Sequence, residues 1–404
     1  MSKLLDTLRL DIHVISAGIG TTDKKDLAIL SFESPVHIVG AFTNNKVVAS
    51  PVRLCRHHLK QRFKRPGKLA IVVNSGCANA CTGVIGDEIC KNVVSHLARQ
   101  LDLNVEQVFP FSTGEILKQL PEKKMLAGIT KAIGSSCCSF EDFADAIMTT
   151  DKARKIVTKS LIIEDKQYNI VGIAKGSGMI CPDMATMLAF VITDIPIDIT
   201  DFNHLHKEIC DDTFNAISVD GEMSTNDSFV GVCASFNDRE NSFLINKADK
   251  HWSAIRDIYS AICDELVMKI VEDGEGATRV VELKVTQAST IKDADHVARG
   301  IANSPLVKTA IFAGDPNLGR ILSAIGACTL SRFNPDKISI VINGYLAIES
   351  GTLASGYNET IARDHMSRKK IDLKVCLGVG AASRRLLFCD LSYDYVKINA
   401  EYRT

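Results

Sequence analysis

The chain has 404 residues, of which 46% are hydrophobic and 24% are charged, and its formal net charge is −1. This balance excludes an intrinsically disordered chain and argues against a nucleic-acid or anionic-membrane partner, because either usually requires a basic face. The length predicts two or three structural units rather than one compact core.

The first ten residues carry acidic and basic side chains where a secretory signal needs an apolar stretch, so we expect a cytoplasmic protein. The longest apolar runs, such as residues 187–192, are far shorter than the roughly 20 residues of a membrane-spanning helix. Thirteen cysteines without a secretion signal favour reduced thiols over disulfides, and their spacing does not match a zinc site.

Short apolar runs bounded by turn residues predict strands at 26–32, 36–42, 68–74 and 168–175. Apolar residues at helical spacing predict helices at 86–101, 201–217 and 252–271. Near the C-terminus, Asn343-Gly344 predicts a hairpin over 337–348, and residues 371–376 alternate like a half-buried strand. This mixture of helices, strands and hairpins predicts an α+β or mixed α/β fold.

Four segments could carry chemistry, and each also has a structural interpretation. Residues 74–83 form either a ligand loop or a plain turn, and residues 109–114 place a hydroxyl beside a glycine amide, a pair that can serve an oxyanion or a helix cap. Residues 272–279 suit a metal loop or one carboxylate on a tight turn. Residues 315–320 suit a strand-to-helix loop, with or without a bound anion.

The most unusual segment runs from Lys175 to Phe190. Its Gly176-Ser-Gly178 lacks the third glycine and the terminal Lys-Ser/Thr of a phosphate loop, which weakens that interpretation. Thr186 precedes an apolar run, where a threonine is ordinarily a strand or cap residue.

Taken together, the motifs resemble one family, the ornithine acetyltransferases, also called glutamate N-acetyltransferases, of arginine biosynthesis. The resemblance covers nearly the whole chain and is carried by residues 16–20, 25–29, 41–46, 74–83, 111–114, 148–151, 175–180, 184–190, 218–221, 224–228, 273–278 and 390–404. The chain departs from the family at Glu115, where a small or apolar residue is usual, and at Leu318, where the family usually carries Trp.

The resemblance implies layered helices and mixed sheets of the ornithine acetyltransferase or DmpA-like fold. It also implies that the chain cuts itself between Ala185 and Thr186. Residues 1–185 would then form an α chain, an N-terminal domain with the oxyanion hole. Residues 186–404 would form a β chain with the nucleophile at its N-terminus and a C-terminal α/β subdomain from about residue 283.

By the same resemblance, Thr186 is the nucleophile and Thr113 and Gly114 form the oxyanion hole. The substrate-binding residues it implies are Thr149, Lys175, Thr186, Glu275, Asn399 and Thr404, with Thr150 as a close alternative to Thr149. These residue types suit the ends of an amino acid, because Lys175 offers a cation to a carboxylate and Glu275 an anion to an ammonium group.

A threonine hydroxyl is a weak nucleophile, and none of the ten histidines stands out as its base. Cleavage before Thr186 would create an α-amine of pKa roughly 7.7–8 on the same residue, and that amine can take the hydroxyl proton. The expected reaction is a ping-pong transfer of acetyl from N-acetylornithine to glutamate.

We expect no metal and no bound cofactor, with acetyl-CoA left open as a co-substrate, and an assembly of two α and two β chains. Two rivals remain at this stage. The first is an amidase or aminopeptidase of the same architecture, in which water resolves the acyl-enzyme. The second is an uncleaved amino-acid-binding protein.

Overall fold

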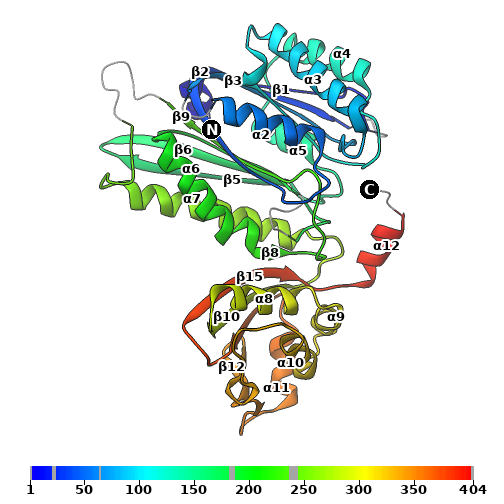
Figure 1. The fold of residues 1–404 in the computed structure, drawn as a ribbon, viewed down its shortest axis with the longest axis vertical. Coiled ribbons are helices and arrows are strands. Elements are labelled where there is room, and N and C mark those ends of the chain that lie inside the picture. The colour runs from blue at the N-terminus through cyan, green and yellow to red at the C-terminus, as the bar shows by residue number, and fades with distance from the viewer. Residues whose placement is uncertain (1, 21–23, 63–64, 182–186, 236–243, 402–404) are drawn as a thin grey trace.

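The computed structural model of the chain describes residues 2–20, 24–62, 65–181, 187–235 and 244–401 (Figure 1). Two mixed sheets organise it, and helices cover both (Figure 1). The predicted mixed α/β class is therefore confirmed.

The first sheet has the strand order β4-β3-β2-β9-β7-β6-β5, and β1 pairs with β2 beside this path. Its strands are β1 (Leu10–Ile15), β2 (Leu27–Phe42), β3 (Gly67–Asn74), β4 (Val108–Ser112), β5 (Lys155–Ile163), β6 (Lys166–Lys175), β7 (Leu188–Pro196) and β9 (Ser228–Ala234). The long strand β2 joins two halves of this sheet. Its first part pairs with β1 and β3, and its second part, from Val36, pairs with β9.

Alternating side chains bury both faces of each half, as a period of two requires. In β7, Leu188, Phe190 and Ile192 face a core shared with β1, β3 and β4, whereas Ala189 and Val191 face a second core. The shared core therefore lies between the two halves of the sheet.

Helices cover the outer faces of both halves. Helices α3 (Gly83–Gln100) and α4 (Glu122–Ile133) pack on β2 and β3, and α6 (Ile199–Asp212) and α7 (Trp252–Glu272) pack on the half with β6, β7 and β9. The result is four layers, helix–sheet–sheet–helix. The remaining helices of this part are α1 (Ser2–Leu8), α2 (Ser50–Arg62) and α5 (Phe140–Ile147).

The second sheet has the order β13-β12-β11-β14-β10-β15-β8. Its strands are β8 (Ile217–Ser218), β10 (Val280–Ala288), β11 (Ser339–Ile342), β12 (Tyr345–Glu349), β13 (Thr352–Leu353), β14 (Lys370–Cys376) and β15 (Ala382–Cys389). The accompanying helices are α8 (Ile291–Ala302), α9 (Pro305–Ala313), α10 (Leu318–Gly326), α11 (Glu359–Met366) and α12 (Tyr393–Glu401). In Figure 1, α12 leaves this sheet and runs back toward the first one.

Most predicted elements are confirmed, and three differ in detail. The strands predicted at 26–32 and 36–42 are one continuous strand, β2, and the helix predicted to reach residue 217 ends at Asp212. The segment that begins at Asp315 follows helix α9 and enters helix α10 at Leu318, so the predicted strand before it is wrong. The hairpin at Asn343-Gly344 is confirmed, with both residues at positive φ as its tight turn requires.

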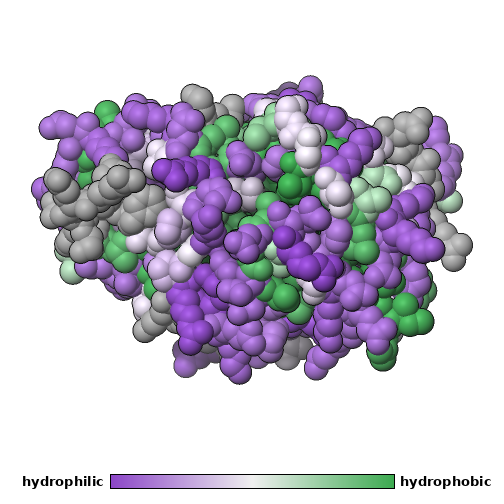
Figure 2. All heavy atoms as spheres, turned by 90° about the horizontal axis from the view of Figure 1, so that it is seen from above, coloured by the Kyte–Doolittle hydropathy of each residue, from purple (hydrophilic) through white to green (hydrophobic). Residues whose placement is uncertain are grey.

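The cysteines are thiols rather than disulfides, and the face of the molecule in Figure 2 is mostly hydrophilic. All 13 cysteines are free. Within the described residues, no helix combines the length and apolar character needed to span a bilayer. Figure 2 shows one end of the molecule, where hydrophilic side chains predominate and hydrophobic ones form small separate patches, as on an ordinary protein surface.

Candidate active site

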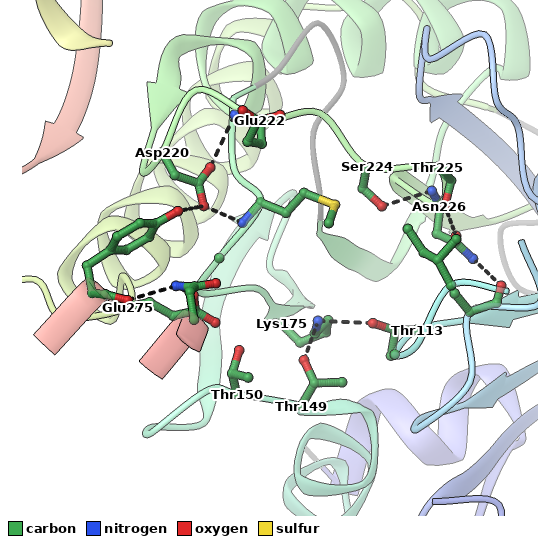
Figure 3. A pocket seen from close by; sticks show the side chains of 17 residues that line it. Thr113, Thr149, Thr150, Lys175, Asp220, Glu222, Ser224, Thr225, Asn226 and Glu275 are labelled. Atoms are coloured by element: carbon green, nitrogen blue, oxygen red, sulfur yellow. Dashed lines mark hydrogen bonds between the residues drawn. The ribbon is translucent and has the colours of Figure 1, made fainter. Parts of the chain in front are cut away.

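A polar pocket of about 130 Å³ lies where loops from both halves of the first sheet meet α12 (Figure 3). One water occupies roughly 30 Å³ of the liquid, so the space suits a small molecule. The described residues that line it and that the sequence predicted are Thr113, Gly114, Thr149, Lys175, Glu275 and Asn399. Residues as far apart in the sequence as Thr113 and Asn399 thus line one cavity.

Lys175 ends β6 and lies at the floor of this pocket with only 4% of its surface exposed. Its Nζ donates to Thr113 Oγ1 at 3.0 Å and to Thr149 Oγ1 at 2.9 Å (Figure 3). An ammonium group has three donors and a hydroxyl one donor and two acceptors. Lys175 therefore keeps one N–H for another partner, and Thr113 keeps its O–H hydrogen to donate.

Gly114 follows β4 and lies against the loop after β3. Its φ is +127°, and a Cβ at this position would lie 2.5 Å from the backbone carbon of Gly76. Only glycine tolerates both the angle and the contact. Thr113 is held by the same loop, because its N–H donates to Asn74 O at 3.0 Å and its carbonyl accepts from Cys77 N at 3.1 Å. These bonds belong to strand-like pairing, so the predicted alternative of a helix cap at Ser112 or Thr113 is wrong.

Glu275 stands on a tight turn after α7, as one of the two sequence interpretations predicted. Its N–H donates to Ser177 O at 2.8 Å, the next residue, Gly276, has φ +71°, and 6% of Glu275 is exposed. Asn399 of α12 donates from Nδ2 to Glu275 Oε2 at 2.8 Å. The far end of the chain thus reaches the pocket and orients its carboxylate.

The two adjacent threonines, Thr149 and Thr150, both line the pocket. Thr149 accepts from Lys175, whereas Thr150 Oγ1 lies 2.7 Å from Ser177 Oγ. The structure thus gives the two hydroxyls different partners, with Thr149 nearer the lysine.

The charges beneath the pocket are balanced. Burial lowers the pKa of Lys175, and the nearby Asp151 carboxylate opposes this shift. Burial would by itself raise the pKa of Asp151, but Lys175 and Lys155 outweigh it and lower that pKa to about 2. A buried carboxylate between two lysines is thus ionised at neutral pH.

The segments around Asp220, Asn226 and Asp227 are part of the family resemblance, but the sequence analysis assigned no role to these three residues. Asp220 accepts from the amides of Met179 and Ile180 at 2.6 and 2.8 Å, and burial raises its pKa. Asn226 donates from Nδ2 to Ala78 O at 2.7 Å and Ser112 O at 2.9 Å, which ties together two walls of the pocket. The dense run of small polar residues at 218–228 was the available signal.

Ala185, Thr186 and Thr404 lie outside the described residues. The residue that follows Thr186 is described: Met187 N donates to Asp227 Oδ1 at 2.9 Å, and this carboxyl is fully buried with its pKa raised by burial. The backbone is thus anchored one peptide after the predicted nucleophile.

The two departures from the family pattern do not line the pocket. Glu115 forms an ion pair with Lys118 at 3.1 Å, and Leu318 begins α10 in the core of the second sheet. Among the described residues, one group of three metal-ligand types comes within 4.8 Å, namely Asp11, His13 and Cys137, and it does not line the pocket either.

A layered α/β fold with buried charges, oriented hydroxyls and a small pocket suits an enzyme active site. The ArgJ family model matches residues 11–404. The arginine biosynthesis bifunctional protein ArgJ of Colwellia psychrerythraea is 40% identical, over 96% of this chain and 94% of that protein. Its namesake from Neisseria meningitidis serogroup A is 38% identical, over 100% of this chain and 97% of that protein.

A crystal structure of arginine biosynthesis bifunctional protein ArgJ from Bacillus halodurans is also similar. It matches with a TM-score of 0.50 and 37% identity, and covers 54% of this chain and 100% of the solved chain. This chain belongs to the ArgJ family and is an acyltransferase of arginine biosynthesis.

Proposed function

We propose that this enzyme transfers the acetyl group of N-acetylornithine to glutamate through an acetyl-Thr186 intermediate, after it has cut its own chain between Ala185 and Thr186. The observation that carries the proposal is the arrangement of one pocket. Thr113 and Gly114 lie on one side and the Glu275 carboxylate on the other, and the strand that follows Thr186 pairs with β6 where Leu188 lies opposite Lys175.

Self-cleavage begins when Thr186 Oγ attacks the carbonyl carbon of Ala185. The C–N bond breaks, the nitrogen takes the proton that Oγ loses, and an ester joins the two residues. Water then hydrolyses this ester, which leaves a carboxylate on Ala185 and a free hydroxyl and α-amine on Thr186. That amine supplies the base which the hydroxyl otherwise lacks.

Residues 186–404 make up about 54% of the chain. The predicted division, with an α chain of 1–185 and a β chain of 186–404, is part of the proposal.

In the transfer cycle, Thr186 Oγ attacks the acetyl carbonyl of N-acetylornithine while its α-amine takes the proton. The Thr113 hydroxyl and the Gly114 amide donate to the developing oxyanion, and Lys175 aims the hydroxyl by donating to its oxygen. Glu275 binds the ammonium end of the substrate. The third N–H of Lys175 donates a hydrogen bond to the carboxylate of the substrate. The C–N bond breaks as the ornithine nitrogen takes the proton from the Thr186 α-ammonium group, and ornithine leaves. The glutamate amine then attacks the acetyl ester, its proton passes through the α-amine to Thr186 Oγ as the C–O bond breaks, and N-acetylglutamate leaves.

Thr149, Asn399 and Thr404 complete the substrate-binding set in this proposal, and neither a metal nor a bound cofactor takes part. Acetyl-CoA is a second acetyl donor to be tested, by its incubation with glutamate alone. The proposal also includes a cytoplasmic enzyme built from two α and two β chains.

Intact-mass analysis with an acetyl-transfer assay tests the proposal. The wild-type protein should separate into two chains, one beginning Thr-Met-Leu, and should form N-acetylglutamate only when both substrates are present. A Thr186→Ala variant should stay one full-length chain and be inactive. Acetate release without glutamate would support the amidase rival, and ornithine binding by an intact, inactive chain would support the binding-protein rival.

A further inference from the structure

Three buried charges beneath the pocket form a cluster, Asp151, Lys155 and Asp273, which we call the Asp–Lys–Asp cluster. Lys155 Nζ lies 2.6 Å from Asp151 Oδ1 and 2.6 Å from Asp273 Oδ2. The three side chains are 0%, 1% and 10% exposed, in that order. Charges this well buried need partners, and here two carboxylates share one ammonium group.

Asp151 also holds the backbone around two predicted substrate residues. Its Oδ1 accepts from Gly176 N at 2.7 Å, one residue after Lys175, and its Oδ2 accepts from Thr149 N at 3.0 Å. Because Lys175 donates to Thr149, this one carboxylate fixes the backbone on both sides of that hydrogen bond.

Asp273 connects the same region to the turn that carries Glu275, two residues later. Its Oδ2 accepts from the amides of Lys152 and Ala153, at 3.0 and 3.3 Å, and from Lys155. The Glu275 turn therefore rests on residues 151–155.

The cluster spans the proposed cut. Asp151 and Lys155 precede residue 185 and Asp273 follows it, so after cleavage the three side chains would belong to two separate polypeptides. The Lys175 side of the pocket comes from the first piece and the Glu275 side from the second. The hydrogen bond from Glu275 N to Ser177 O crosses between the pieces at the same place.

We propose that the Asp–Lys–Asp cluster positions Glu275 relative to Lys175 and sets the distance between them. That distance determines how tightly the enzyme binds the ammonium and carboxylate ends of its substrate. The assignment of those two ends rests on the proposed function. The cluster does not touch the substrate, because none of its members lines the pocket.

The geometry predicts a particular kinetic signature. Glu275 would hold the ammonium group equally in the ground state and the transition state, so a displaced Glu275 should raise KM and leave kcat nearly unchanged. A merely structural role would instead lower the amount of active enzyme and leave KM as it was.

Asp273→Asn keeps the size of the side chain and an oxygen for the two amides, but removes the charge that pairs with Lys155. Lys155→Arg keeps the charge and alters the geometry. Arg154→Met is the matched control, because Arg154 directly precedes Lys155 and its ion pair with Asp145 is exposed. All three proteins, and the wild type, are assayed after intact-mass analysis and thermal melting.

We expect Asp273→Asn to raise KM for N-acetylornithine and the calorimetric Kd for ornithine at least tenfold, with kcat within about threefold. Lys155→Arg should shift the same two constants less, and Arg154→Met should match the wild type. Unchanged KM and Kd in both folded cluster variants would overturn the proposal, as would failure of both variants to fold, because the cluster would then be a folding element.

The proposed function fails separately, when the wild type itself transfers no acetyl group. In that case the ornithine Kd of the same variants still decides whether the cluster positions the pocket.

Discussion

At the scale of single residues, burial decides which side chains can act as bases. His206 is fully buried, with Nδ1 2.7 Å from Tyr259 Oη and Nε2 3.0 Å from Phe229 O. Its ring stacks on Phe229 at a centroid distance of 3.8 Å. Burial lowers the pKa of His206 to about 3, so this histidine stays neutral in the core and serves stability rather than proton transfer.

His206 predicts acid sensitivity. In the unfolded chain the pKa of His206 returns to about 6.5. Below that pH the unfolded state binds a proton at His206 and the folded state does not. The contribution of His206 to stability is therefore complete above pH 6.5 and declines by about 1.4 kcal/mol per pH unit as the pH falls toward 3. Urea unfolding at pH 7, 6 and 5 measures this slope. His206→Gln should reduce the slope, with the remainder coming from other buried histidines such as His37 and His58, and an unchanged slope in that variant would contradict the assignment.

Thr113 predicts a loss of rate. Thr113→Val keeps the shape of the side chain but removes the hydroxyl that Lys175 aims, so kcat should fall by about 10²–10³ with KM nearly unchanged. Steady-state kinetics of acetyl transfer measures both constants. Thr130→Val is the control, because its hydroxyl pairs with His96 on the surface, away from the pocket. A Thr113→Val enzyme with wild-type kcat would remove Thr113 from the oxyanion hole.

At the scale of elements, the pocket is made by loops that pack backbone against backbone. Gly114 lies against Gly76, and Gly178, in the loop after β6, lies against the carboxylate of Glu275. A Cβ on Gly178 would lie 2.5 Å from Glu275 Cδ and 2.6 Å from Oε1. The Glu275 carboxylate can therefore occupy this position only because Gly178 has no side chain.

Gly178→Ala should displace the Glu275 side chain without unfolding the protein, because the end of a flexible side chain can move aside. We expect KM for N-acetylornithine to rise about tenfold while the melting temperature changes little. Gly326→Ala in α10 is the control, since its Cβ would meet nothing within 4 Å. A Gly178→Ala enzyme with unchanged KM would show that Glu275 does not bind substrate from its present position.

At the scale of the whole molecule, the first sheet interleaves the two sides of the proposed cut. Strands β9 and β7 follow residue 186 along the chain, yet they lie between β2 and β6, which precede it. The seven-residue ladder from β2 to β9 and the six-residue ladder from β6 to β7 cross that division. Two pieces joined in the centre of a buried sheet cannot part without exposing both cores.

The interleaved sheet predicts that the cleaved pieces remain one particle. Native size-exclusion chromatography should yield both pieces in a single peak, and they should separate only in denaturant. Mass analysis of each fraction identifies the pieces. Elution of either piece alone under native conditions would contradict this arrangement of strands.

The local patterns of the sequence determined most elements. Short apolar runs predicted β3 and β6, helical spacing predicted α3 and α7, and Asn343-Gly344 predicted the hairpin, because these signals depend on residues close together in the chain. The motifs that resemble the family also pointed to Thr113, Lys175, Glu275 and Asn399, which the fold brings to one pocket.

Only the tertiary structure decided what joins these residues. Lys155 and Asp273 are 118 positions apart, and no spacing in the sequence links them, yet they form one buried cluster with Asp151. The sequence also could not show that β7 and β9 enter the middle of a sheet begun by earlier strands. A local sequence pattern indicates which side of a strand is buried. The element that packs against that side is determined only when segments distant in the sequence come together.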